Sequence, residues 1–315
     1  MAPTGTRTTE ASAPHAQSRS RWKSPEVTVS ASVFRKFQQL IYCETGIWLS
    51  ESKTALLCGR LARRLRILGL SSLSEYYEAV AEPGQHHERM LMIDAITTNE
   101  TRFFREPKHF EYLLHTVFPT WRKLADQGLR PRRVRIWSAG CSSGEEAYSL
   151  AMMMAAHLPE SEGWQTRVLG TDISTRVLGM AREGIYRMTS SLDIPPDFLR
   201  SFMLKGHAEH QGEVKVTREI RQLVEFNRLN LIEDAYPLDG HFDAIFCRNV
   251  LIYFDNASKT KVVGKLVRYL APQGLFFIGH AENLHGVIRG LRSLSGTVYV
   301  HKTEQKDLQE TSASL

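Results

Sequence analysis

The alternation of short apolar segments with helical ones over residues 134–300 is the feature that most constrains the fold. Five segments have the length and composition of buried strands, and the stretches between them repeat apolar residues at helical spacing. Strands that alternate with helices form a parallel, doubly wound α/β sheet. We expect a sixth apolar segment at the end of the series to join this sheet antiparallel. The six predicted strands are residues 134–137, 167–170, 223–226, 242–246, 275–278 and 297–300.

The sequence pattern also distinguishes an N-terminal region and an insert within the α/β region. Residues 28–105 show helical periodicity without a strand pattern; Leu57, Leu61 and Leu65 lie on one face of a helix that Gly69 is placed to end. We therefore expect a small all-helical N-terminal domain and linker, followed by an α/β domain over residues 106–303. Within that domain, residues 184–221 are too long for a plain connecting loop and predict a small inserted β-subdomain.

The composition of the chain is that of an ordinary globular protein, apart from its two ends. Residues 1–27 and 304–315 are poor in large apolar side chains and are predicted to be a disordered tail and a flexible C-terminus. Hydrophobic residues make up 42% of the chain and the net charge is +6, which favours an acidic partner without identifying it. No apolar run is long enough to span a membrane, and the N-terminus is not a secretory signal.

Four cysteines, Cys43, Cys58, Cys141 and Cys247, are spaced without a CxxC pair. This spacing argues against a zinc ribbon or a thioredoxin-like motif, and it favours a reduced, cytoplasmic setting. We predict no metal site.

The turn after the first predicted strand contains Gly140 and Gly144, followed by Glu145 and Glu146. Glycines at the end of a first strand let a ligand approach the backbone closely. The spacing is GxxxG rather than the GxGxxG of a dinucleotide site, and the two acids would repel an anion at the helix start. The turn therefore favours a nucleotide ligand that carries an ammonium or sulfonium group, or it is simply a well-capped helix start.

Polar residues also follow the next strands, at the edge where a doubly wound sheet binds its ligands. Asp172 ends the second strand, where an acid accepts hydrogen bonds from ribose hydroxyls. Ser174 is the better placed residue to cap the next helix, which would leave Asp172 for a ligand. Asn230 and Leu231 follow the third strand and suit the edge and face of an adenine, although an asparagine there is equally explained as a turn residue.

The fourth strand leads into Cys247, Arg248 and Asn249, and then to Tyr253, whose ring face suits a sulfonium by cation–π attraction. A core tyrosine is the alternative. Upstream, residues 97–106 are unusually polar for a domain junction. Their side chains suit a cap over a ligand or a solvated linker.

Taken in order, these motifs resemble those of the chemotaxis receptor methyltransferases over about residues 30 to 303. GIWL and RLARRLRILGL also match that family's basic helical N-terminal domain, while the long N-terminal tail is a departure from it. The motifs that carry the resemblance are TTNETRFFRE, WSAGCSSGEEAYS, TDISTRVLGMAREGIY, NLIE, FDAIFCRNVLIYFD and GLFFIGHAEN.

The resemblance implies a class I S-adenosylmethionine methyltransferase fold, S-adenosyl-L-methionine as cofactor, and S-adenosyl-L-homocysteine as product. It implies methylation of glutamate side chains on the cytoplasmic helices of chemoreceptors. Arg105 and Tyr253 match the pair nearest the transferred methyl, Glu145 matches the acid that takes the methionine ammonium, and Asp172 matches the ribose ligand. The other implied cofactor contacts are Asn99, Thr101, Arg105, Asn230, Leu231, Cys247, Arg248 and Asn249.

The resemblance also implies the partners. Cationic side chains on one helix, at Arg60, Arg63, Arg64 and Arg66, can steer the acidic receptor helices, or they are a solvated helix face. The β-subdomain docks a receptor C-terminal peptide in some members of the family. We expect a monomer that neither binds nucleic acid nor inserts into a membrane.

Glutamate is ionised at neutral pH, because its reference pKa is about 4.3, so its methylation needs no general base. The enzyme has to orient and desolvate the acceptor instead, and we expect Arg105 to orient it with the help of Tyr253. A nucleic-acid methyltransferase is suggested by the basic composition, but the CRNV turn lacks the Asn/Asp-Pro-Pro-aromatic run typical of exocyclic amine methylation. A non-catalytic S-adenosylmethionine sensor or scaffold is the other alternative.

Overall fold

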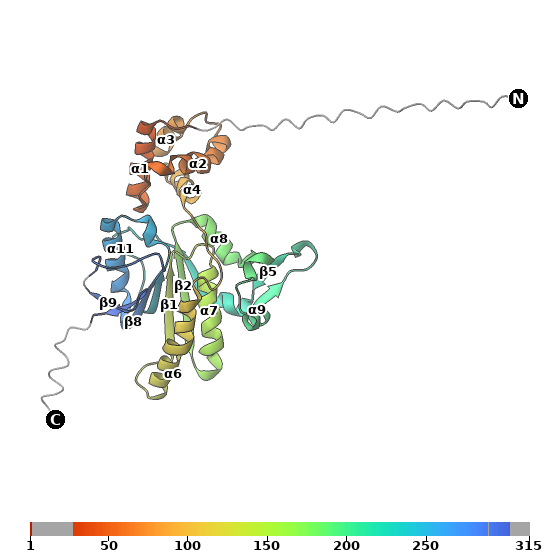
Figure 1. Ribbon diagram of the computed structural model, residues 1–315, viewed down its shortest axis with the longest axis vertical. Coiled ribbons are helices and arrows are strands. Elements are labelled where there is room, and N and C mark those ends of the chain that lie inside the picture. Colours follow the sequence, from red (N-terminus) through yellow and green to blue (C-terminus); the bar gives the residue numbers. More distant parts are fainter. Residues whose placement is uncertain (2–27, 289, 303–315) are drawn as a thin grey trace.

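A computed structural model of the chain describes Met1, residues 28–288 and residues 290–302 (Figure 1). The predicted disordered tail and flexible C-terminus therefore lie outside the described residues, apart from Met1. The described chain forms a helical domain, an α/β domain and a small inserted sheet, as the sequence predicted. No helix in the described ranges has the length and apolar character needed to cross a membrane.

The helical domain packs around one apolar core. Phe37, Leu57, Leu61 and Tyr76 are completely buried in it. Gly69 ends the second helix in the left-handed conformation with φ of 67°, as expected for a glycine C-cap. The helices are α1 (Ala31–Thr45), α2 (Thr54–Leu68), α3 (Leu73–Ala81) and α4 (His86–Ile96), with a short 3₁₀ turn at Glu51–Lys53.

The first helical segment of the α/β domain, residues 107–126, is continuous but not uniform. It consists of α5 (Pro107–Tyr112), a π-helical stretch at Leu113–Val117, and α6 (Phe118–Asp126). Pro119 lies at the start of α6 and has no N–H to donate into the preceding turn, which accounts for the wider turn at this point.

The α/β domain is built on a seven-stranded sheet of order β6-β2-β1-β7-β8-β10-β9. Strands β6, β2, β1, β7 and β8 are parallel, and β10 pairs antiparallel with β8 and β9, as predicted for the last strand. The strand β9 was not predicted. The bounds are β1 (Arg133–Ala139), β2 (Gln165–Asp172), β6 (Val224–Arg228), β7 (Phe242–Cys247), β8 (Leu270–Ile278), β9 (Leu291–Ser295) and β10 (Val298–His301).

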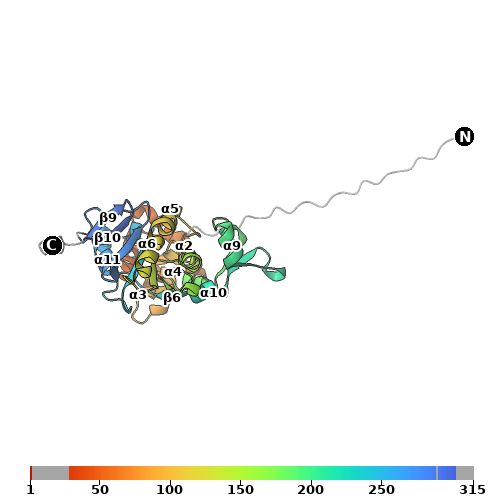
Figure 2. The same ribbon diagram turned by 90° about the horizontal axis from the view of Figure 1, so that it is seen from below.

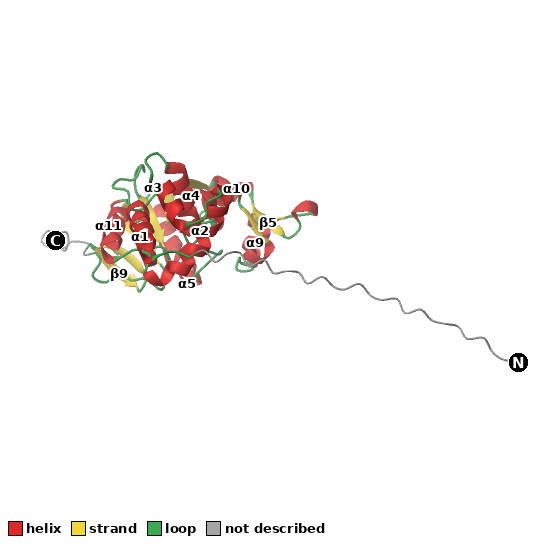
Figure 3. Cartoon of the chain, turned by 90° about the horizontal axis from the view of Figure 1, so that it is seen from above, coloured by secondary structure: helices red, strands yellow, loops and turns green. Residues whose placement is uncertain are grey.

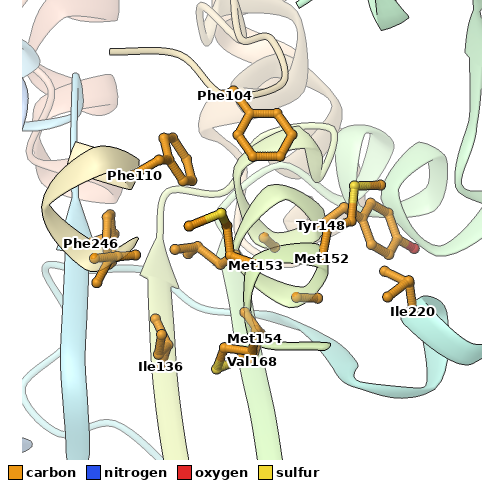
Figure 4. Packing of buried hydrophobic residues seen from close by; sticks show 14 of the residues in the cluster. Phe104, Phe110, Ile136, Tyr148, Met152, Met153, Met154, Val168, Ile220 and Phe246 are labelled. Carbon is orange, nitrogen blue, oxygen red and sulfur yellow. The ribbon is translucent and has the colours of Figure 1, made fainter. Parts of the chain in front are cut away.

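Alternate side chains of the central strands bury into two apolar layers. Ile136 and Phe246 face the layer formed with α5, α6 and α7 (Glu145–His157), shown in Figure 4. Trp137 and Ile245 face the opposite layer, which includes Val262 from α11 (Asn256–Arg268). Because both faces are covered, the strands read as continuous apolar runs in the sequence.

Residues 184–221 form the predicted β-subdomain, a second sheet of order β3-β5-β4 with antiparallel pairing. This region projects from the side of the α/β domain, as the views from below and above show (Figures 2 and 3). Its elements are β3 (Ile185–Arg187), α9 (Pro196–Phe202), β4 (Met203–Lys205), β5 (Glu213–Val216) and α10 (Arg218–Gln222), and it follows α8 (Thr175–Glu183).

The helical domain lies at one end of the α/β domain (Figure 1). Ile47 forms an isolated antiparallel bridge with Phe254, and the backbone N–H of Trp48 donates to the carbonyl of Tyr253 at 3.0 Å. Asn230 Nδ2 donates to the carbonyl of Glu44 at 2.7 Å. The loops that follow β6 and β7 therefore hold the helical domain at the carboxyl ends of the parallel strands.

Candidate functional site

A cavity of about 500 Å³ lies between the two domains at the carboxyl edge of the sheet. Its size is in the range of small-molecule sites. Both domains and the segment that connects them contribute to its walls. The predicted site residues that line it are Asn99, Thr101, Arg105, Asp172, Asn230, Leu231, Arg248, Asn249 and Tyr253.

The turn between β1 and α7 forms one wall of this cavity. Gly140 has φ of 85°, and a Cβ atom at this position would lie 2.3 Å from Cγ2 of Val250. The following Ser142 also has a positive φ, of 50°. Because L side chains rarely adopt this conformation, the turn brings its backbone close to the cavity at a cost in strain.

Asp172 holds this turn in place. Its two carboxylate oxygens accept the backbone N–H groups of Ser142 and Ser174, each at 2.9 Å. Burial is the largest influence on its carboxyl and raises its pKa, while these hydrogen bonds lower it. Ser174 caps α8, as predicted. Asp172 is therefore available to a ligand only through its remaining lone pairs.

The two glutamates at the start of α7 have different surroundings. Glu145 accepts a hydrogen bond from Ser143 Oγ at 2.7 Å and lies outside the cavity wall. Glu146 lines the cavity, where its carboxylate accepts from Ser138 Oγ at 2.7 Å and pairs with Arg248. Burial raises the pKa of the Glu146 carboxyl, and Arg248 opposes this shift. Glu146 is therefore the acid of this pair that lines the cavity, and the predicted Glu145 lies behind the wall.

Arg248 is the most enclosed charged side chain of the cavity wall, with only 2% of its side chain exposed. Its guanidinium lies 3.1 Å from both Glu106 and Glu146 and also donates to the carbonyl of Arg105. The neighbouring Cys247 does not reach the cavity, because it is the last residue of β7 and its side chain is buried on the α11 side of the sheet. The predicted ligand contact of Cys247 is therefore not seen.

Residues 97–101 and Arg105 of the polar segment form part of the cavity wall. Ser142 Oγ donates to the carbonyl of Asn99 at 2.9 Å, which ties the segment to the turn after β1. Arg105 Nη1 donates to the carbonyl of Glu100 at 3.0 Å, so this side chain also holds the shape of the segment. Thr101 is half-buried in the wall.

Asn230 has the features of both interpretations offered for it. Its Oδ1 accepts the backbone N–H of Ile232 at 3.3 Å, as a turn asparagine would, and its side-chain amide holds Glu44 of the helical domain. It also lines the cavity beside Leu231. Tyr253 lines the cavity from the loop after β7 and its side chain is half-buried, so it is not a core tyrosine.

Two residues that hold the loops of the cavity wall in place were missed from the sequence. Glu106 accepts from Arg248, from Asn249 Nδ2 and from the backbone N–H of His280, and so ties together the loops after β7 and β8. Glu282 accepts the backbone N–H groups of Asn249 and Gly279 at 3.0 and 2.7 Å. Both lie within motifs that had been noticed, RFFRE and GHAEN. The signal that could have identified them is a charged residue next to apolar ones in each motif.

Four arginines of α2 were predicted to form a basic face, and the structure separates them into two pairs. Arg60 donates to the carbonyl of Thr97 at 2.7 Å, and Arg64 Nε donates to Glu88 at 2.9 Å. These two side chains are engaged within the helical domain. Arg63 and Arg66 are exposed, so they are the two available to a partner.

The chemistry of the wall suits a cationic nucleoside. Asp172 is buried and 15% of the Glu146 side chain is exposed, and no histidine occurs among the described residues that line the cavity. Burial disfavours the ionised form of both acids, and positive charge on a ligand would oppose this effect.

Comparison with known proteins agrees with this chemistry. Residues 99–300 match the model for the CheR methyltransferase, SAM binding domain, and residues 32–97 match the model for the CheR methyltransferase, all-alpha domain. Chemotaxis protein methyltransferase 2 of Pseudomonas aeruginosa is 41% identical over 84% of this chain and 91% of its own length. The chemotaxis protein methyltransferase of Salmonella typhimurium is 39% identical, over 87% of this chain and 91% of that protein. That of Escherichia coli is 40% identical, over 87% and 92%. The chain therefore belongs to the CheR methyltransferase family, whose catalytic domain binds S-adenosylmethionine.

Proposed function

We propose that this chain transfers the methyl group of S-adenosylmethionine to glutamate side chains of chemoreceptors, giving glutamate methyl esters and S-adenosylhomocysteine. Relatives at about 40% identity are named chemotaxis protein methyltransferases, and the chain covers more than nine tenths of their length. The chain is thus an S-adenosylmethionine-dependent methyltransferase of chemotaxis, and the glutamate acceptor is the part that we add.

The observation that carries this acceptor is that the described cavity wall contains neither a histidine nor a buried acid without a partner. Within the described wall there is no histidine, and its buried acids are engaged by Arg248 or by backbone N–H groups. A hydroxyl acceptor would need a base to take its proton during the transfer. A glutamate carboxylate is already ionised at neutral pH, so this wall favours a carboxylate as the nucleophile.

The wall residues divide between the parts of the cofactor. We assign the ribose hydroxyls to Asp172 and the methionine ammonium to Glu146 in place of Glu145. Asn230 and Leu231 take the adenine, Arg248 and Asn249 border the methionine portion, and the segment with Asn99, Thr101 and Arg105 closes over the bound molecule. The remaining lone pairs of Asp172 and the position of Glu146 in the cavity wall support these assignments.

Arg105 and Tyr253 act on the acceptor. The bound cofactor supplies a methyl carbon activated by positive sulfur, so the acceptor oxygen forms the new C–O bond while the C–S electron pair stays on sulfur. No proton moves in this step. Arg105 orients the acceptor carboxylate by its charge, and Tyr253 aligns it with its hydroxyl, so catalysis arises from positioning and exclusion of water. Both side chains line the cavity and both are half-buried.

Recognition of the receptor involves surfaces outside the cavity. The exposed Arg63 and Arg66 of α2 steer acidic receptor helices by charge complementarity. The β-subdomain is available to a receptor C-terminal peptide, since its small sheet projects from the body of the protein (Figure 2). We place the enzyme in the cytoplasm as a monomer, in keeping with its four free cysteines.

The test is transfer of radiolabelled methyl from S-adenosylmethionine to a purified chemoreceptor cytoplasmic fragment, followed by alkali. Label that base releases as methanol is a carboxyl methyl ester and supports the proposal. Label that survives base would indicate nitrogen methylation and a different acceptor. Cofactor binding without transfer to any of several receptors would favour a sensor, and transfer to nucleic acid would contradict the proposal outright.

A further inference from the structure

Three side chains with metal-binding chemistry converge beside the cavity, from three different segments. Glu106 precedes α5, His109 lies within α5, and His280 follows β8. One donor atom from each lies within 4.8 Å of the others. His109 is buried and His280 is exposed, so the cluster has an inner and an outer histidine. None of the three is in the set that lines the cofactor cavity.

One ring nitrogen of the inner histidine, His109, has a hydrogen-bond partner among the described residues and the other has none. Nε2 of His109 lies 2.7 Å from Thr297 Oγ1. Nδ1 is buried and has no hydrogen-bond partner among the described residues, although it faces Glu106 Oε2 at 3.5 Å. If Nε2 carries the proton, a nitrogen lone pair faces a carboxylate oxygen. Two such acceptors repel each other unless a proton or a metal cation lies between them.

The spacing and the donor types suit a zinc-class ion. Ligands at about 2.0 Å from a tetrahedral metal lie about 3.3 Å from one another, close to the observed separation of Nδ1 and Oε2. Two imidazoles and a carboxylate form a donor set typical of Zn²⁺, with a fourth position left for water.

The charge around the cluster permits a dication despite the neighbouring guanidinium. Arg248 pairs with Glu146 as well as with Glu106. One positive charge is therefore shared by two carboxylates, which leaves the group with a net charge of −1 when both are ionised. A metal on Glu106 would compete with Arg248 for Oε2, and Arg248 could then turn fully to Glu146.

We propose that Glu106, His109 and His280 form a binding site for a zinc-class divalent cation, and that its occupation inhibits methyl transfer. Inhibition follows from the position of Glu106, which holds Arg248 and Asn249 in the cavity wall through its two carboxylate oxygens. This proposal departs from the sequence analysis, which predicted no metal site. No local spacing linked residues 106, 109 and 280, because the fold alone brings the last of them to the first two.

The chain offers a matched pair of variants for the test. His280→Ala removes the exposed ligand of the cluster, and His285→Ala removes another exposed histidine in the same loop that lies outside it. Both are made in the untagged full chain on a Cys43→Ser background, because Cys43 is an exposed thiol that would bind metal itself. Zn²⁺ is titrated by calorimetry, and Co²⁺ by its visible absorption. Thermal melts without metal confirm that both variants fold.

We expect one equivalent of Zn²⁺ to bind the parent and His285→Ala proteins, with at least a tenfold loss of affinity in His280→Ala. Co²⁺ should give absorption bands of nitrogen and oxygen ligation. Zn²⁺ should slow methyl transfer by the parent and by His285→Ala at concentrations that leave His280→Ala unaffected. Equal affinity in the two variants, or no binding to the parent, would overturn the proposed site. Binding without any change in methyl transfer would overturn its inhibitory role.

Discussion

Arg248 and Glu146 form a buried ion pair in the wall of the cofactor cavity, with Nη1 3.1 Å from Oε2 and side chains that are 2% and 15% exposed. The pair joins the turn after β7 to the start of α7. It also keeps a carboxylate in a position where burial alone would favour its protonated form. The ionisation of Glu146 and the stability of the fold therefore both depend on the Arg248–Glu146 ion pair.

Removal of Arg248 should destabilise the protein. Arg248→Met leaves Glu106 and Glu146 without their cation, and loss of one partner of a buried pair costs about 3–5 kcal/mol. Urea denaturation measures the free energy of unfolding. The double variant Arg248→Met/Glu146→Gln should recover part of the loss, since it removes one orphaned charge. A single variant as stable as the parent would show that the pair contributes nothing.

Affinity for S-adenosylmethionine should weaken in mild acid. Glu146 binds a cation only when ionised, and its pKa is raised from 4.5 by burial, so protonation begins at a higher pH than for an ordinary glutamate. Below that pKa the dissociation constant should rise about tenfold per pH unit. Calorimetry across pH 5 to 8 measures it. Glu146→Gln should bind more weakly and lose this dependence, whereas Glu145→Gln should keep it.

Asp172 should contribute to both folding and binding. Asp172→Asn places an amide N–H opposite the backbone N–H of Ser142 or Ser174, because each now donates to one oxygen of the carboxylate. An unmet buried donor costs about 1–3 kcal/mol, so the melting temperature and the cofactor affinity should both fall. Ser174→Ala is the control, since it removes the helix cap and keeps the carboxylate. Unchanged cofactor affinity in Asp172→Asn would exclude the ribose role.

Arg105→Ala should lower kcat for receptor methylation. Loss of a charged hydrogen bond to the acceptor is worth about 2 kcal/mol, which corresponds to roughly a 30-fold lower rate. Arg105→Lys should recover part of it, because the charge remains. Since Arg105 also donates to the carbonyl of Glu100, the affinity for cofactor is measured in parallel. Near-normal turnover in Arg105→Ala would rule out an orienting role.

The two pairs of arginines on α2 should respond differently to substitution. Arg63→Glu/Arg66→Glu should reduce kcat/KM for a receptor fragment roughly tenfold at low salt and less at high salt, with an unchanged melting temperature. Arg60→Ala should instead lower the melting temperature, because it frees carbonyl groups at the end of α4. Insensitivity of activity both to salt and to charge reversal would leave α2 without a steering role.

The strands and the ligand edge of the sheet were predictable because both faces of the central strands are buried, which makes their apolar runs continuous. β9 was not predicted, since Arg292, Ser293 and Ser295 give an edge strand a polar sequence. The choice between Glu145 and Glu146 depends on the rotation of α7 about its axis, and adjacent acids in a sequence do not reveal it. Likewise, the sequence does not distinguish Arg60 and Arg64 from Arg63 and Arg66. Only the fold brings the first two to their partners in and after α4.

The cofactor cavity has walls from both domains, with Trp48 and Leu49 on one side and Gly140 and Asp172 on the other. A molecule bound there would add a contact between the two domains, which also meet through hydrogen bonds and through the packing of Ile47 and Ile173. Dissociation of that molecule should therefore make the connecting segment at residues 97–105 more mobile. The rate at which a protease cuts this segment should then report occupancy of the site. The position of the helical domain relative to the sheet would then depend on whether the methyl donor is bound.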